Sequence, residues 1–137
     1  MAVIQPYLFF NGRCDEAIEF YQRTLGAEVQ MLMRNKDAPP GNAPPLPPGS
    51  ENKVMHASLS IGGAVVMASD GMCSGEPSFK GFSLSLAYPG ETDCRRAFDA
   101  LGNGGRIDMP LGKTFWTECF GMVTDRFGVQ WMIGLDH

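Results

Sequence analysis

The sequence predicts an α+β fold made of two tandem β-α-β-β-β modules. Strand-like and helix-like patterns follow one another in the same order twice, and several residues of the first half recur at matching places in the second. At 137 residues the chain is long enough to bury roughly two-thirds of the surface that it exposes when unfolded. We therefore expect one domain over residues 1–137, with modules at about 1–70 and 78–137.

The first module opens with a predicted strand over residues 3–10, where β-branched and aromatic residues dominate. Pro6 has no backbone N–H to donate, so we expect this strand to be irregular or locally unpaired. Apolar residues then recur on one face of a helix predicted at roughly 13–25, and Gly26 supplies its C-terminal stop. Three further strands are predicted at 27–34, 53–61 and 64–69.

A proline-rich insertion, residues 35–52, interrupts this module and carries six of the ten prolines. The segment is poor in the backbone donors that a helix or sheet requires. A flexible surface loop is one interpretation. A lid over a pocket and an arm that reaches a partner subunit are the alternatives.

The second module repeats the order, with a strand at 79–88, a helix at 91–103 and strands near 105–108, 117–124 and 129–135. Residues of the two modules align in pairs: Asp15 with Asp93, Phe20 with Phe98, Gly26 with Gly104, Val29 with Ile107, and segment 63–67 with 128–132. These pairs indicate an internal repeat.

The repeat has a functional consequence. Each module is expected to form a curved sheet with a helix on its outer face, which leaves the concave inner face open. Two modules set side by side would form a cup-shaped mixed sheet around a cleft lined by alternate strand residues. The fold therefore predicts a small-molecule pocket.

Composition argues against several classes of partner. The net charge of −4, with basic residues scattered along the chain, argues against nucleic acid. No apolar run approaches the ~20 residues that span a bilayer, and the N-terminus lacks the pattern of a signal peptide. We expect a cytoplasmic protein without membrane contact. The four cysteines lack short spacings and are expected to be free thiols.

Three segments carry a family resemblance: FNGRCDEAIEFYQRTLG at 10–26, VMHASLSIGGAVVMASD at 54–70 and PLGKTFWTECFGMVTDRFGVQWMI at 110–133. With them the chain resembles the PhnB-like branch of the vicinal oxygen chelate superfamily, which also contains glyoxalase I, bleomycin-resistance proteins and extradiol dioxygenases. The resemblance covers nearly the whole chain, and the last segment is its most specific part. It implies the glyoxalase/bleomycin-resistance fold.

Members of this superfamily with metal chemistry place four ligands, usually His, Glu or Gln, on the inner strands. The resemblance puts these positions at Gln5, near Met67, near Phe82 and near Met132. Only Gln5 suits a hard or borderline cation, because a thioether is a soft, weak ligand and a phenyl ring is none. We therefore expect no metal and no cofactor, and we expect these four residues to line the ligand site.

Two residues are candidates for proton transfer. If Ala57 and Leu59 face the core, His56 lies on the opposite face of its strand. It is then either a structural histidine or a pocket donor or general base. Glu118, the only carboxylate of FWTECFGMV, is either a polar acid/base group of the pocket or a solvated edge-strand residue.

Large apolar residues supply the remaining candidates. Phe115 and Trp116 lie at a loop-to-strand junction, where aromatic rings either wall a cleft or simply pack. Met67 and Met132 give the inner surface an adaptable character that suits varied apolar ligands, although a plain core would contain them equally well.

Two functions fit this pattern. The favoured one is a metal-free protein that binds a small apolar or amphipathic molecule in the cleft, as bleomycin-resistance relatives do. The alternative is an isomerase or lyase in which His56 or Glu118 transfers a proton while Gln5 orients a substrate carbonyl. The resemblance also implies a homodimer, which exposed sheet edges would favour.

Overall fold

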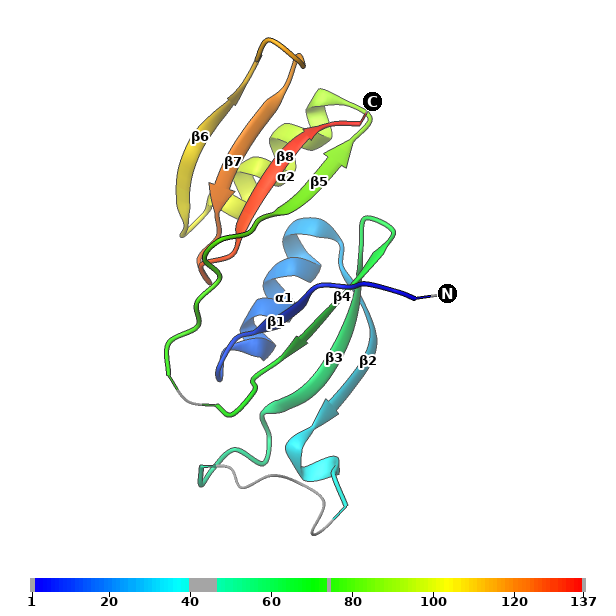
Figure 1. Ribbon diagram of the computed structural model, residues 1–137, viewed down its shortest axis with the longest axis vertical. Helices are drawn as coiled ribbons and strands as arrows, with labels where there is room; N and C mark the ends of the chain where they lie inside the picture. Colours follow the sequence, from blue (N-terminus) through cyan, green and yellow to red (C-terminus); the bar gives the residue numbers. More distant parts are fainter. Residues whose placement is uncertain (1, 40–46, 74, 137) are drawn as a thin grey trace. The chain divides into compact units, whose positions relative to one another are not determined.

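The computed structural model describes residues 2–39, 47–73 and 75–136 (Figure 1). Its contacts divide the chain into two compact units, Met1–Pro77 and Ser78–His137. The centre of the proline-rich insertion, 40–46, lies outside the described residues, and with it most of the expectation of a loop, lid or arm. No helix in the described ranges is long and apolar enough to cross a bilayer.

In its described residues, the first unit combines one α-helix with a four-stranded sheet. The elements are β1 (Tyr7–Phe9), α1 (Cys14–Leu25), β2 (Glu28–Arg34), the 3₁₀ turn η1 (Asn35–Asp37), β3 (Val54–Ile61) and β4 (Ala64–Ser69). The strand order is β1-β4-β3-β2, in which β1 runs parallel to β4 and the other neighbours are antiparallel. Helix α1 covers one face of this sheet (Figure 1).

The described residues of the second unit likewise combine one α-helix with a four-stranded sheet. The elements are β5 (Leu84–Tyr88), α2 (Glu91–Gly102), β6 (Arg106–Gly112), β7 (Phe120–Thr124) and β8 (Gln130–Leu135). The strand order is β5-β8-β7-β6, with β5 parallel to β8 and antiparallel pairing elsewhere. Helix α2 packs on one face of this sheet (Figure 1).

The two sheets share one pairing pattern, which confirms the predicted α+β fold of two β-α-β-β-β modules. In each unit the first strand runs parallel to the last, with Tyr7 beside Met67 in one and Ser85 beside Met132 in the other. The two methionines aligned from the sequence thus occupy equivalent places. The β-structure consists of two four-stranded mixed sheets, and every pairing between described strands joins strands of one unit. The expected cleft of a cup-shaped sheet stays a prediction.

Strand β1 is shorter than the predicted strand over residues 3–10, since it spans only Tyr7–Phe9. Pro6 limits it, because proline has no N–H for the ladder. The Pro6 carbonyl still accepts a hydrogen bond of 2.9 Å from the backbone N–H of Met67. Two other predicted strands, at 79–88 and 117–124, begin later than expected, at Leu84 and Phe120.

Strand β6 is longer than the strand predicted at 105–108, and it continues through Pro110 to Gly112. A proline is tolerated there because β6 is at the edge of its sheet, where one side of the backbone makes no ladder. The register shifts on both sides of Met109, so the strand passes Pro110 through an irregular stretch.

Alternating burial gives each sheet a helix-covered face and an open face. In β3, Ala57 and Leu59 are buried, whereas His56 and Ser58 are half-buried on the other side. This is the division of faces expected from the sequence. Buried helix residues complete the core: Cys14, Ala17, Ile18, Phe20 and Tyr21 of α1, and Cys94, Ala97, Phe98 and Leu101 of α2.

The fully buried carboxylate of Asp70, just after β4, caps helix α1. Its Oδ1 accepts hydrogen bonds of 2.8 Å from the backbone N–H groups of Gly12 and Cys14. Its Oδ2 accepts a third, also 2.8 Å, from the N–H of Val54 at the start of β3. A negative charge at a helix N-terminus also complements the helix dipole. One side chain therefore fixes α1 to two strands. Burial and this carboxylate both raise the pKa of the Cys14 thiol.

The two ends of the proline-rich insertion are tied together by hydrogen bonds. Backbone bonds run from Asn35 N–H to the Lys53 carbonyl at 3.0 Å and from Lys36 N–H to the Glu51 carbonyl at 2.9 Å. The Asn35 amide also donates to the Ser50 carbonyl at 2.8 Å. The insertion thus leaves the sheet and returns to it at one narrow place, which we call the neck: Asn35 and Lys36 on one side, and Ser50, Glu51 and Lys53 on the other.

We expect Asp70→Ala to lower the free energy of unfolding of the first unit by about 3–5 kcal/mol, because three backbone donors lose their acceptor in a buried place. Guanidinium unfolding and hydrogen exchange of the α1 amides would measure the loss. The matched control is Asp93→Ala, which removes a partly exposed helix aspartate paired with Arg96 and should change stability by less than about 1 kcal/mol. Equal effects of the two substitutions would contradict the capping role.

Candidate functional site

The side of the first sheet that faces away from α1 combines exposed apolar side chains with a polar centre. Strand register assigns its members: Tyr7 lies beside Met67, and Met67 lies beside Ser58. Ser58 in turn lies beside Met31 of β2. We call this surface the first open face and define it by Tyr7, Phe9, Met31, Met33, His56, Ser58 and Met67.

His56 is at the polar centre of the first open face. Its Nδ1 lies 2.8 Å from the hydroxyl oxygen of Tyr7, which is 49 residues away along the chain. Its Nε2 lies 3.5 Å from the Ser58 hydroxyl, at the outer limit of a hydrogen bond. The structure thus places this predicted candidate on the open side of the sheet, with a strong partner on one ring nitrogen and a weak one on the other.

Tyr7 was not anticipated from the sequence. Its ring stacks on Phe9 with 5.0 Å between the ring centroids, and its centroid lies 5.5 Å from that of the His56 ring. Burial raises the pKa of the Tyr7 phenol, and a hydrogen bond with Ser69 opposes this shift. The phenol therefore keeps its proton at neutral pH and can act as a donor. The period-two pattern of β1 was the available signal, because it separates Tyr7 and Phe9 from buried Leu8.

Two methionines of β2 were also missed. Met31 and Met33 are 44% and 36% exposed, and Met33 lies beside His56 in the strand register. Together with half-exposed Phe9 they surround the polar centre with apolar surface. Methionine side chains are flexible and polarisable, so such a surface adapts to apolar groups of different shape. Met67, which the sequence did predict, is half-buried between Tyr7 and Ser58.

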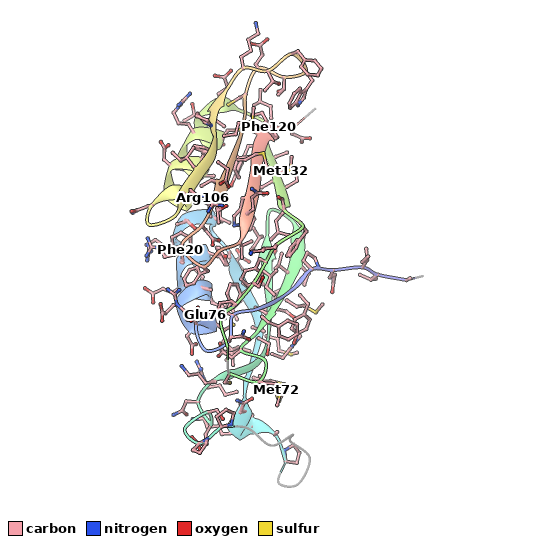
Figure 2. All side chains as sticks on the ribbon, turned by 60° about the vertical axis from the view of Figure 1, so that its left-hand side comes forward. Phe20, Met72, Glu76, Arg106, Phe120 and Met132 are labelled. Atoms are coloured by element: carbon pink, nitrogen blue, oxygen red, sulfur yellow. The ribbon has the colours of Figure 1, made fainter. Side chains whose placement is uncertain are left out.

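The corresponding surface of the second sheet, which we call the second open face, carries a hydrogen-bonded network around Asp108. The carboxylate accepts bonds from Thr124 Oγ1 at 2.5 Å and Gln130 Nε2 at 3.1 Å. Arg106, at the start of β6 (Figure 2), donates to it at 2.7 Å. Ser83 extends the network by donating to the Gln130 carbonyl oxygen. These residues come from segments far apart in sequence, and no sequence motif predicted them as a group.

The Asp108 network shifts the acidity of its central group. Hydrogen bonds from Thr124 and Gln130, aided by Arg106, lower the pKa of Asp108 to about 2. A carboxylate that is stabilised in this way stays ionised over the whole physiological range. Its donors are part of the sheet itself, so we interpret the network as a device that holds β6, β7 and β8 in register.

Glu118 lies in the loop before β7, not inside a strand. Its side chain is 68% exposed, and Oε1 is 3.9 Å from the Lys113 ammonium group. It belongs to the second unit, whereas His56 belongs to the first. Their action as an acid/base pair stays a prediction.

Phe115 and Trp116 share this loop and form an exposed aromatic cluster. Phe115 is 98% exposed and Trp116 is 53% exposed, and their ring centroids lie 4.9 Å apart. Trp116 also makes an edge contact with Phe120 at 5.4 Å. Figure 2 shows Phe120 on the second sheet together with Met132, which is half-buried on the second open face. The cluster is open to contact, and its role in ligand binding stays a prediction.

The four positions expected for metal ligands do not fit a catalytic metal. Gln5 is half-buried ahead of β1, and Phe82 is 46% exposed ahead of β5. Met67 and Met132 contribute only thioethers. One amide and two thioethers are a poor donor set for the hard or borderline cations of metal-dependent relatives. Within the described ranges, no group of three or more His, Cys, Asp or Glu side chains is placed to hold a metal ion.

Two surface pockets lie away from these candidates. One, of about 250 Å³, is lined by Asn35, Lys36, Pro47, Pro48, Ser50 and Glu51 at the neck of the proline-rich insertion. The other, of about 360 Å³, is lined by Glu91, Thr92, Arg95, Arg96 and Asp99 of α2. Neither contains a residue of the two open faces. The candidate site within the first unit is defined by side chains on the first open face.

Comparison with protein families matches residues 3–133 to the family described as Glyoxalase/Bleomycin resistance protein/Dioxygenase superfamily. Among curated proteins, the chain is similar to Protein YjdN of Escherichia coli (strain K12), with 41% identity over 138 residues, 96% of this chain and 94% of YjdN. It is also similar to an uncharacterized protein of Mycobacterium bovis, Mb0911c, with 33% identity over 94 residues, 64% of this chain and 62% of that protein.

Two solved structures resemble the chain over nearly its full length. Protein PA1353 from Pseudomonas aeruginosa superposes with a TM-score of 0.84 and 40% identity, with all of both chains covered. The PhnB protein from Bacillus cereus superposes with a TM-score of 0.80 and 28% identity, covering 98% of this chain and 100% of that chain.

The Asp108 network predicts a specific pH dependence. Since the folded pKa of about 2 lies below the ordinary value of 3.8, the carboxylate stabilises the second unit fully above pH 4 and loses this contribution as the pH falls toward 2. Asp108→Asn should flatten that part of the stability curve, measured as guanidinium midpoints between pH 2 and 6. Asp99→Asn, at an exposed helix residue, should leave the wild-type curve unchanged. A parallel curve for Asp108→Asn would refute the assignment.

Proposed function

Since the chain belongs to the glyoxalase/bleomycin resistance protein/dioxygenase superfamily, we propose that it binds a small apolar or amphipathic molecule at the first open face. The likeness to the PhnB protein of Bacillus cereus confirms the family resemblance inferred from the sequence. The comparisons with relatives support only the fold and the family. The proposed class of ligand is inferred from the side chains of this chain.

One observation carries the proposal: four large apolar side chains are exposed together around polar His56. Tyr7, Phe9, Met31 and Met33 have exposures of 37%, 50%, 44% and 36%. Contiguous apolar surface of this kind marks binding sites in soluble proteins. A ligand with an apolar body would gain about 25 cal/mol for each Å² of this surface that it covers.

The polar groups of the site favour binding over proton transfer. Glu118, the second group of the alternative acid/base mechanism, is mostly exposed and pairs with Lys113. The two ring nitrogens of His56 instead contact the hydroxyl groups of Tyr7 and Ser58, which carry no charge. An amphipathic ligand would find an apolar rim and one hydrogen-bonding centre there, a common composition for small-molecule sites.

A charge on the first open face should weaken apolar binding. We expect the wild type to bind the uncharged dye N-phenyl-1-naphthylamine and Met31→Glu to bind it about tenfold more weakly, because a carboxylate would be desolvated under the dye. Dye fluorescence in a titration gives both dissociation constants. Met31 is exposed, so the substitution should change the free energy of unfolding by no more than about 0.5 kcal/mol.

The matched control lies on the same strand. Val29 is 38% exposed, an exposure similar to that of Met31. Its register partner Leu59, however, is buried on the helix-covered face. Val29→Glu should therefore leave dye binding unchanged. No dye binding by the wild type, or equal losses in the two variants, would reject the first open face as the site. A thermal-shift screen of metabolites and antibiotics would then identify natural ligands, because a ligand stabilises the fold that binds it.

A further inference from the structure

We propose that His56, oriented by Tyr7, donates a hydrogen bond from Nε2 to an oxygen acceptor of the bound molecule. This inference rests on the proposed function and narrows it: the ligand would carry a carbonyl, carboxylate, sulfonate or similar acceptor beside its apolar body. Tyr7 acts as a positioning residue, which selects the tautomer of the imidazole ring.

The argument starts from the short contact between Tyr7 and His56. The Tyr7 hydroxyl lies 2.8 Å from Nδ1, a distance typical of a well-formed hydrogen bond. A neutral imidazole has one donor and one acceptor nitrogen. A phenol hydroxyl can donate or accept, so the direction of this bond depends on the tautomer of the ring. In the proposed arrangement the protonated phenol donates, and Nδ1 is the acceptor. The ring proton then resides on Nε2.

The Nε2 proton is available to a ligand. The Ser58 hydroxyl is 3.5 Å from Nε2, which makes it a weak partner that a closer acceptor can displace. His56 is half-buried on the open side of β3, so its ring is part of the first open face. In histidine sites generally, the hydrogen bond made by one ring nitrogen determines whether the other nitrogen carries the proton.

The surroundings of His56 indicate what the rest of the ligand must be. Phe9 is stacked on Tyr7, and Met33 lies next to His56 on the neighbouring strand. An acceptor group bound at Nε2 would thus have apolar side chains on both sides. A purely polar molecule would leave these side chains in water, and a pure hydrocarbon would leave the Nε2 proton without a better partner. The face suits a molecule with both parts.

Two dyes with the same ring system test this inference. 8-Anilino-1-naphthalenesulfonate carries a sulfonate acceptor, and N-phenyl-1-naphthylamine is the same skeleton without it. We expect the wild type to bind the sulfonate dye about fivefold more tightly, the gain of one hydrogen bond. His56→Phe keeps an aromatic ring but no donor. It should remove this preference and change binding of the uncharged dye by less than twofold.

His56→Gln provides a rescue variant, because its amide retains an N–H donor. It should keep part of the preference for the sulfonate dye. Thermal melting and near-ultraviolet circular dichroism would verify that each variant is folded, since the sulfonate dye also binds loosened proteins. If His56→Phe is unfolded, the comparison of wild type with His56→Gln and Tyr7→Phe still decides the question.

The role of Tyr7 has its own readout. Long-range proton–nitrogen spectra report which imidazole nitrogen carries the proton, and the chain has only two histidines, so His56→Phe assigns the signals. We expect a protonated Nε2 in the wild type and a mixture of tautomers in Tyr7→Phe. A protonated Nδ1 in the wild type would overturn the orientation by Tyr7.

The outcomes separate this inference from the proposed function. If the wild type binds neither dye, the proposed function fails. If it binds both dyes and His56→Phe keeps the preference for the sulfonate, recognition by His56 is overturned while apolar binding at this face stands. Loss of the preference in His56→Phe, with the uncharged dye still bound, supports the inference.

Discussion

In the first unit, the Asp70 carboxylate joins the end of β4, the start of β3 and the N-terminus of α1 through three backbone hydrogen bonds. Because the carboxylate is fully buried, these donors have no water to replace it. The helix is therefore held on one side of the sheet. That placement decides which side of every strand is covered by the helix and which side is left open.

The open face combines a rigid and an adaptable part. Tyr7 is held by its hydrogen bond with His56 and by stacking on Phe9, whereas Met31 and Met33 are exposed, flexible side chains at the sheet edge. If the proposed binding is correct, such a surface would select for a polar group at one point and tolerate different shapes around it. Such tolerance agrees with the general finding that one fold can host many functions.

The fold could be predicted because it depends on patterns within single segments. The site could be predicted only in part, because it depends on contacts between distant segments. Helix periodicity and the paired positions of Phe20 and Phe98 need only local sequence. The partnership of Tyr7 with His56 depends on strand order and register across 49 residues, which no local pattern encodes. The Asp108 network was not predicted from the sequence for the same reason. The strand predicted near 105–108 is shorter than β6, because proline argues against a strand unless the strand is known to be at an edge.

The neck formed by Asn35 and Lys53 has a consequence for how this chain can vary. Each unit closes when its first strand meets its last, and the entropy of closing a loop grows only with the logarithm of its length. The proline-rich insertion therefore adds only about 0.3 kcal/mol to that closure. Residues can be gained or lost beyond the neck without shifting the register of β2 on β3. Length variation among relatives should concentrate at this point, leaving the first open face unaltered.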